Sequence, residues 1–174
     1  MRKQIMEILT EICPGIDFEH ETALIDLGNY NDAYPRMAEL AEDWMARYPS
    51  IQMVLDVHRD SLETDDGTQL ALRADVDGEA CAKLLLVMGS NGSGLEHPGW
   101  RQNLANAARL QALCEQRAPG LMRDLLLRAS RYNQHLTPRS MLLEVGTAGN
   151  ALEEALRSAD IFSQVLADCL LGKA

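Results

Sequence analysis

One histidine lies where an apolar run ends, a position that suits chemistry. His58 directly follows the run 51–57, whose continuous apolarity indicates a strand buried on both faces. Because strand side chains alternate, Asp56, His58 and Asp60 would share one face if the strand continues. An imidazole beside carboxylates can bind a metal or act as a base. The alternative is a structural histidine that caps the strand or pairs with Asp60, and spacing alone does not separate the two.

A carboxylate inside a second apolar run is the other candidate. Glu144 lies in the run 141–145. A buried glutamate is costly unless a cation or hydrogen-bond donors meet it, and burial raises its pKa toward the range of general acid–base catalysis. The alternative is a structural glutamate paired with an arginine such as Arg131. Because ligands of open α/β sheets bind at the carboxyl ends of strands, we expect Glu144 and His58 to converge on one crevice.

Two further histidines are weaker candidates. His97 precedes a predicted helix and could line a cleft with Trp100 as a wall, or belong to an ordinary helix-start loop. His135 ends the polar run 131–135, which could bind polar groups of a substrate or form a turn. The sequence contains no Gly-x-Ser-x-Gly elbow and no obvious cysteine–histidine pair. If the chain is an enzyme, metal-assisted hydrolysis with a histidine ligand and a glutamate base fits best.

Alternating helical and strand patterns must position these residues. Such alternation predicts an α/β fold around one core. Asn150 would cap the last helix, with Glu153 completing a capping box. Helices are expected at 4–13, 37–48, 98–118 and 150–170, and strands at 51–57, 70–76, 84–88, 121–129 and 141–145.

Composition excludes several classes of protein. The chain has 174 residues and a net charge of −10, which argues against a non-specific nucleic-acid binder. No apolar run approaches the roughly 18 residues needed to span a bilayer, and the start is not that of a signal peptide. As written, the chain is therefore expected to be cytoplasmic. Its four cysteines lack C-x-x-C spacing, and most are expected to be buried free thiols.

Four ordered segments resemble one family. Residues 48–60, 94–103, 131–135 and 142–146 are similar to the stage II sporulation protein P family of zinc-dependent peptidoglycan hydrolases. The resemblance covers about residues 29–174. It implies an α/β three-layer sandwich with a mixed, mostly parallel sheet, like that of N-acetylmuramoyl-L-alanine amidases and truncated at its N-terminal strand.

The resemblance also implies an activity. The family cleaves the amide between the muramoyl lactyl group and L-alanine of the stem peptide, with endopeptidase activity as well, outside the cytoplasmic membrane at the cell wall. It implies zinc as the cofactor, His58 as a zinc ligand and Glu144 as the catalytic acid–base. The implied partners are peptidoglycan stem peptides and other sporulation engulfment proteins. Apart from the resemblance, our candidates for substrate binding are His97, Arg59, Arg131, Asn133 and His135, with surface ion pairs as the alternative for the arginines.

Two departures from the family pattern matter. The family carries an earlier His-Thr-His-Thr block and a following Glu, which supply its remaining zinc ligands, and this chain lacks that block. Residues 1–28 instead resemble the start of an acyl or D-alanine carrier protein, without its Asp-Ser-Leu site. We therefore expect a carrier-like segment, 1–28, before a partial amidase domain, 29–174. We also expect an unpaired sheet edge beside the strand of His58. The alternative function is a catalytically incomplete remnant that binds wall peptides or a partner protein.

Overall fold

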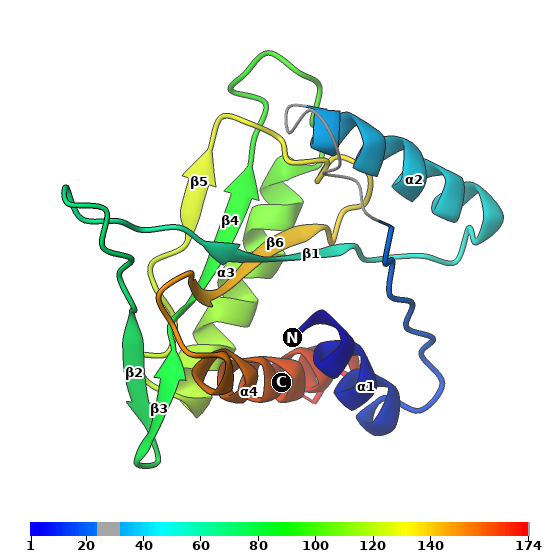
Figure 1. Cartoon of the computed structure of the whole chain (residues 1–174). Coiled ribbons are helices and arrows are strands. Elements are labelled where there is room, and N and C mark those ends of the chain that lie inside the picture. The colour runs from blue at the N-terminus through cyan, green and yellow to red at the C-terminus, as the bar shows by residue number, and fades with distance from the viewer. Residues whose placement is uncertain (24–31, 174) are drawn as a thin grey trace.

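Four helices and six strands form the part of the chain that the structure, a computed structural model, describes, namely residues 1–23 and 32–173 (Figure 1). The helices are α1 (Arg2–Ile12), α2 (Ala33–Arg47), α3 (Trp100–Arg117) and α4 (Leu152–Leu170). The strands are β1 (Leu55–Asp60), β2 (Arg73–Val76), β3 (Glu79–Ala82), β4 (Leu84–Gly89), β5 (Leu126–Arg128) and β6 (Met141–Thr147).

The main sheet has the strand order β1-β6-β4-β5. β1 pairs with β6 and β4 with β5 in parallel, whereas β4 and β6 are antiparallel. The expected α/β fold with a mixed, mostly parallel sheet is therefore confirmed. β2 and β3 form a separate hairpin that turns at Asp77 and Gly78, whose φ angles are 55° and 83°. β1, the strand that contains His58, is an edge strand among the described residues.

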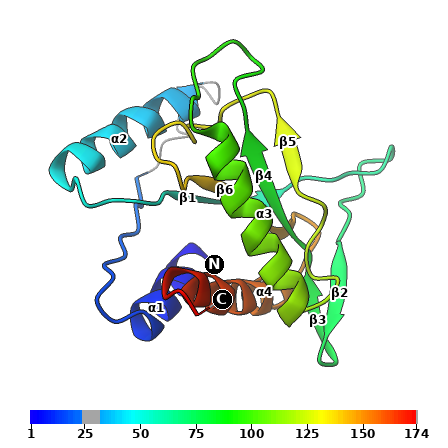
Figure 2. The same cartoon turned by 180° about the vertical axis from the view of Figure 1, so that it is seen from behind.

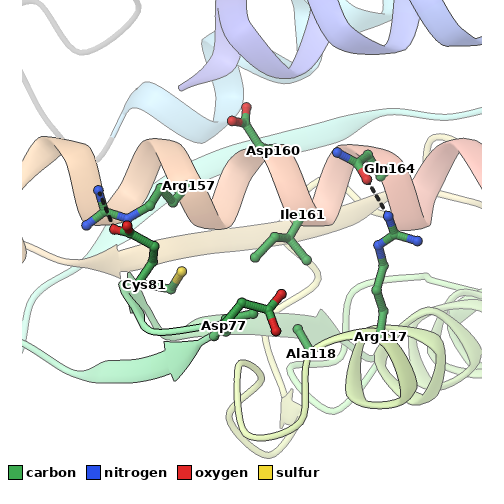
Figure 3. A pocket seen from close by; sticks show the side chains of 10 residues that line it. Asp77, Cys81, Arg117, Ala118, Arg157, Asp160, Ile161 and Gln164 are labelled. Atoms are coloured by element: carbon green, nitrogen blue, oxygen red, sulfur yellow. Dashed lines mark hydrogen bonds and ion pairs between the residues drawn. The ribbon is translucent and has the colours of Figure 1, made fainter.

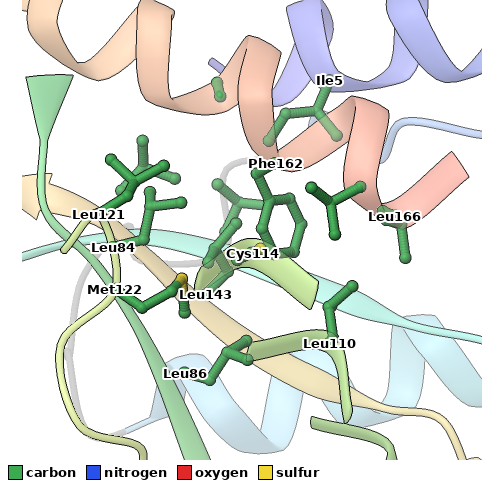
Figure 4. Packing of buried hydrophobic residues seen from close by; sticks show 14 of the residues in the cluster. Ile5, Leu84, Leu86, Leu110, Cys114, Leu121, Met122, Leu143, Phe162 and Leu166 are labelled. Atoms are coloured by element: carbon green, nitrogen blue, oxygen red, sulfur yellow. The ribbon is translucent and has the colours of Figure 1, made fainter. Parts of the chain in front are cut away.

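The main core lies between one face of the sheet and helices α1, α3 and α4 (Figure 2). Phe162 of α4, Cys114 of α3 and Leu143 of β6 are each fully buried there (Figure 4). All six residues of β4 are buried, which explains its continuous apolar sequence. Three of the four cysteines are buried, and all four are free thiols, as expected.

The opposite face of the sheet is covered less completely. α2 approaches it through Tyr34, whose ring lies 5.7 Å from that of Tyr132, and Asn133 Nδ2 donates to the Tyr34 carbonyl at 2.7 Å. The helices thus form a full layer on one face and a partial layer on the other. The small apolar cluster under Tyr132 consists of Leu85, Val87, Leu142 and Leu126.

α1 is built into the same core as the rest of the chain. Ile5 and Leu9 are buried against α4, and the Gln4 side-chain amide donates to Asp160 of that helix. Arg2 Nε donates to the Val57 carbonyl of edge strand β1 at 3.1 Å. The residue 28–29 boundary lies outside the described residues, and the separate character of residues 1–28 stays a prediction.

The cap of α4 differs from its sequence prediction by one residue. The helix begins after Ala151, and Glu154 accepts a hydrogen bond from the Ala151 backbone N–H at 3.1 Å. The prediction that Asn150 caps the helix with Glu153 is wrong, because the Asn150 side chain forms hydrogen bonds within the turn before the helix. Its Oδ1 accepts the Thr147 backbone N–H, and its Nδ2 donates to Glu154.

Replacing Leu9 by alanine should destabilise the whole domain. Leu9 is 4% exposed and packs in the main core, so Leu9→Ala is expected to lower the free energy of unfolding by about 2–4 kcal/mol. Urea denaturation measures the change. The matched control on the same helix is Glu11→Ala, an exposed position expected to change stability by less than about 0.5 kcal/mol. Equal effects of both variants would show that α1 is not part of the cooperative core.

Candidate functional site

The two residues singled out from the sequence are direct neighbours across two strands. In the parallel β1–β6 pair, His58 of β1 lies opposite Glu144 of β6. Residues opposite each other in a ladder point to the same face, and the alternating neighbours Val57 and Leu143 point to the main core. The sheet thus brings His58 and Glu144 together on the face away from α3 and α4. Their chemical roles remain predictions.

A bulge follows this pair immediately. Asp60 pairs with Thr147, so β6 supplies one more residue than β1 after His58 and Glu144. Gly146 makes this possible, because its φ of 72° is costly for residues with a side chain. A Cβ at Gly146 would also lie 2.7 Å from the Ala82 Cβ. Bulges of this kind re-aim side chains beside functional sites.

His58 is held by a carboxylate on its own strand. Its Nε2 lies 2.7 Å from Asp56 Oδ1, and this hydrogen bond raises the pKa of His58 despite partial burial. The negative charges of Asp56 and Glu144 act in the same direction, and Arg2 opposes them. The partner is therefore Asp56, whereas the structural alternative considered from the sequence was Asp60. A metal could use Nε2 only by displacing the proton shared with Asp56.

Glu144 is a partly buried carboxyl group with an unsatisfied oxygen. Its Oε2 is buried and has no hydrogen-bond partner within the described residues. Burial raises its pKa to about 7, while the charge of His58 opposes the shift. The expected alternative partner, Arg131, instead donates to the Glu96 carbonyl at 3.1 Å. A carboxyl group with this pKa exchanges protons readily near neutral pH, as general acid–base chemistry requires.

An arginine that sequence reasoning missed completes this face. Arg123 Nη1 lies 2.6 Å from Asp60 Oδ2, and both side chains are about a quarter exposed, at 24% and 23%. Arg123 lowers the pKa of Glu144 and Asp60 raises it. Glu144 therefore faces two basic groups, His58 and Arg123, each paired with an aspartate. Arg123 lies in an apolar segment after α3 that contains no functional motif. The only sequence signal was Asp60, a carboxylate at the end of β1 that could pair with a basic residue.

The remaining predicted substrate residues lie elsewhere. Arg59 donates through Nη2 to the carbonyls of Thr147 and Asn150, the latter at 2.6 Å, and so ties β1 to the turn before α4. Its guanidinium is thus used in hydrogen bonds that hold the fold together, and its role in substrate binding stays a prediction. The four others occur on the loops that follow β4 and β5: His97, Arg131, Asn133 and His135.

These loops meet at the far end of β4 from Glu144. Leu85 lies opposite Glu144, whereas the strand ends four residues later at Gly89, roughly 13 Å along. Gly89 touches the 130–131 backbone so closely that a Cβ would lie 2.7 Å from the Arg131 Cα. The structure therefore does not bring this group to the His58–Glu144 pair.

Two histidines of this distant group are packed against each other. The rings of His97 and His135 are 6.5 Å apart, and burial lowers the pKa of both. His97 is only 1% exposed, so a direct contact with substrate would require its loop to open.

The described residues do not form a zinc site by themselves. A catalytic zinc usually has three protein ligands. Within residues 1–23 and 32–173, no group of three or more His, Cys, Asp or Glu side chains is placed to hold a metal ion. His58 is the only ligand predicted here, and its Nε2 is bound to Asp56.

A separate pocket of about 470 Å³ lies between the β2–β3 hairpin, the end of α3 and α4 (Figure 3). Its two arginines are engaged: Arg157 donates to the Ala80 carbonyl, and Arg117 donates to Gln164. Burial raises the pKa of the Cys81 thiol on its wall, which keeps the thiol protonated and unreactive. This pocket shares no lining residue with the His58–Glu144 face.

Comparison with known proteins gives a consistent result. The family model described as Stage II sporulation protein P matches residues 4–167, a range that crosses both segments expected from the sequence. The chain is 32% identical over 149 residues to Stage II sporulation protein P of Bacillus subtilis (strain 168). That alignment covers 80% of this chain and 35% of the relative, so the chain spans about a third of its length. No solved structure matches the chain. Among the described helices, none has the length and apolar character needed to cross a membrane.

Removing the ionisable group of Glu144 should change how stability depends on pH. The unfolded chain releases this proton near the ordinary value of 4.5, and the folded chain retains it until about pH 7. The native state therefore loses stability as pH rises from about 4.5 to about 7. Glu144→Gln should match the wild type at pH 4 and exceed it at pH 8 by at most about 3 kcal/mol.

Urea denaturation at these two pH values tests this expectation. Glu153→Gln, an exposed position on α4, is the control and should change little at either pH. A difference between wild type and Glu144→Gln that is the same at both pH values would contradict the raised pKa.

Proposed function

Since the chain belongs to the stage II sporulation protein P family, we propose that its β1–β6 face hydrolyses cell-wall peptidoglycan during sporulation. The observation that carries the proposal is Glu144, a partly buried carboxyl group with a pKa of about 7 that lies opposite His58. Structural glutamates normally have partners for their buried oxygens, whereas Glu144 Oε2 has none within the described residues.

The proposed reaction is hydrolysis of the amide between the muramoyl lactyl group and L-alanine. Ionised Glu144 takes a proton from the attacking water, whose oxygen bonds to the carbonyl carbon. The C–N bond then breaks, and Glu144 delivers the proton to the departing amine. A pKa near 7 populates both forms of Glu144 at neutral pH, so the same group serves both steps. Cleavage within the stem peptide would need the same proton transfers.

A second candidate is a module that binds wall peptides without turnover. The observation that favours it is the incomplete metal site, because within the described residues His58 has no companion ligands. Whether the proposed hydrolysis uses zinc is therefore a separate question, which the metal content of the purified protein tests.

Turnover is tested with purified peptidoglycan. The wild type should release stem peptides with a free L-alanine amino group, identified by mass spectrometry, and Glu144→Gln should reduce the rate by about 10²–10⁴-fold. The variant should still sediment with the wall, because only the proton-transfer group is lost. Wild-type sedimentation without release would favour the binding module. Equal rates for wild type and variant would remove Glu144 from the mechanism.

Metal content is tested after dialysis against zinc. With one predicted ligand among the described residues, we expect this chain to retain less than one zinc ion, and His58→Ala to abolish what is retained. His135→Ala is the matched control, since His135 lies at the other end of the sheet. Elemental analysis that finds one tightly held zinc per chain would show that a full ligand set forms after all. Zinc retained in His58→Ala would exclude His58 as a ligand.

A further inference from the structure

Of the arginines near the site, Arg123 is the one placed to meet a ligand beside Glu144, since Arg2 lies at the outer edge of β1 and donates to the Val57 carbonyl. Arg59 donates to two backbone carbonyls, and Arg131 lies at the far end of β4. The Arg123 side chain has one hydrogen-bond partner within the described residues, Asp60, which it reaches through Nη1. A guanidinium has five N–H donors in a planar fork, so most of those of Arg123 are left for another acceptor.

The position of Arg123 relative to the sheet sets what it can reach. Its backbone N–H donates to the Leu84 carbonyl at 2.7 Å, which fixes it at the start of β4. Its side chain ends at Asp60 of β1. Because β6 lies between β4 and β1, the Arg123–Asp60 pair crosses over β6, next to Glu144. A ligand that lies along β6 and reaches Glu144 therefore passes this guanidinium.

We propose that Arg123, anchored by Asp60, binds a carboxylate of an acidic peptide that lies across the β1–β6 face beside Glu144. The guanidinium fork matches a carboxylate with two parallel hydrogen bonds, which a lysine cannot reproduce. Asp60 occupies Nη1 and so holds the fork in one orientation. This assignment rests on the proposed function, for which it names a residue that binds the acidic peptide of the substrate.

The charges on this face permit such binding. His58 and Arg123 are basic, and Asp56 and Asp60 each pair with one of them. Arg2, at the edge of β1, adds a further positive charge that acts on His58. Both aspartates that act on Glu144 are thus already paired with a basic group, so neither is left to repel an arriving carboxylate.

Binding is measured with L-alanyl-D-glutamate as the probe and the same dipeptide with both carboxylates amidated as its control. Backbone amide shifts in nuclear magnetic resonance report the site and the Kd without requiring turnover. We expect the wild type to bind the carboxylate form, and Arg123→Gln to weaken this binding at least 10-fold. Arg123→Lys keeps the charge and the pairing with Asp60 and should weaken binding several-fold. Arg128→Gln, at an exposed position of β5, should change nothing.

Several outcomes would overturn the assignment. They are equal affinity in Arg123→Gln, no preference for the carboxylate form, and no binding by the wild type. Thermal melting of Arg123→Lys controls for folding, since this variant retains the ion pair. Carboxylate binding that depends on Arg123 without wall hydrolysis would support this inference and remove the proposed function. If the protein hydrolyses the wall but its affinity for the peptide is unchanged in Arg123→Gln, the proposed function stands and this inference fails.

Discussion

The parallel pairing of β1 with β6 is the interaction on which the site depends. It sets His58 opposite Glu144 and turns both away from the core that contains Val57 and Leu143. Because strand side chains alternate, a slip of one residue in β6 would move Glu144 to the core face and Leu143 to the open face. The penalty for burying a carboxylate in the core therefore helps to fix the register. The bulge at Gly146 then ends this register directly after His58 and Glu144.

Electrostatics on the open face follow from that register. Two pairs of side chains, Asp56–His58 and Asp60–Arg123, act on one carboxyl group whose buried oxygen has no partner within the described residues. Burial dominates the pKa of Glu144, and the flanking pairs act on it with opposing signs. The pairs thus supply local order with little net charge, and the protonation of Glu144 adds or removes one negative charge beside them.

The sequence predicted those parts of the structure that local patterns determine. The apolar runs around His58 and Glu144 identified both strands, but not their ends: β1 continues past His58 to Asp60, and β6 continues past Glu144 to Thr147. The strand expected at 121–129 shortens to β5, because Leu121 and Met122 are buried in the main core and only an isolated bridge pairs Met122 with Leu84. Arg123 could not be assigned, since its partner Asp60 belongs to a distant segment. The distance between the His97 group and Glu144 likewise depends on the antiparallel placement of β4, which no local pattern specifies.

The connection between β1 and β6 also has a consequence for how the site comes into being. Parallel strands cannot be joined by a tight turn, and here β2, β3, β4, α3 and β5 all intervene. Contacts between distant segments form slowly, because the loop between them must close before the contact stabilises it. A chain still emerging from the ribosome has His58 long before Glu144. The His58–Glu144 pair therefore exists only after synthesis has passed β6, which couples assembly of the candidate site to completion of the fold.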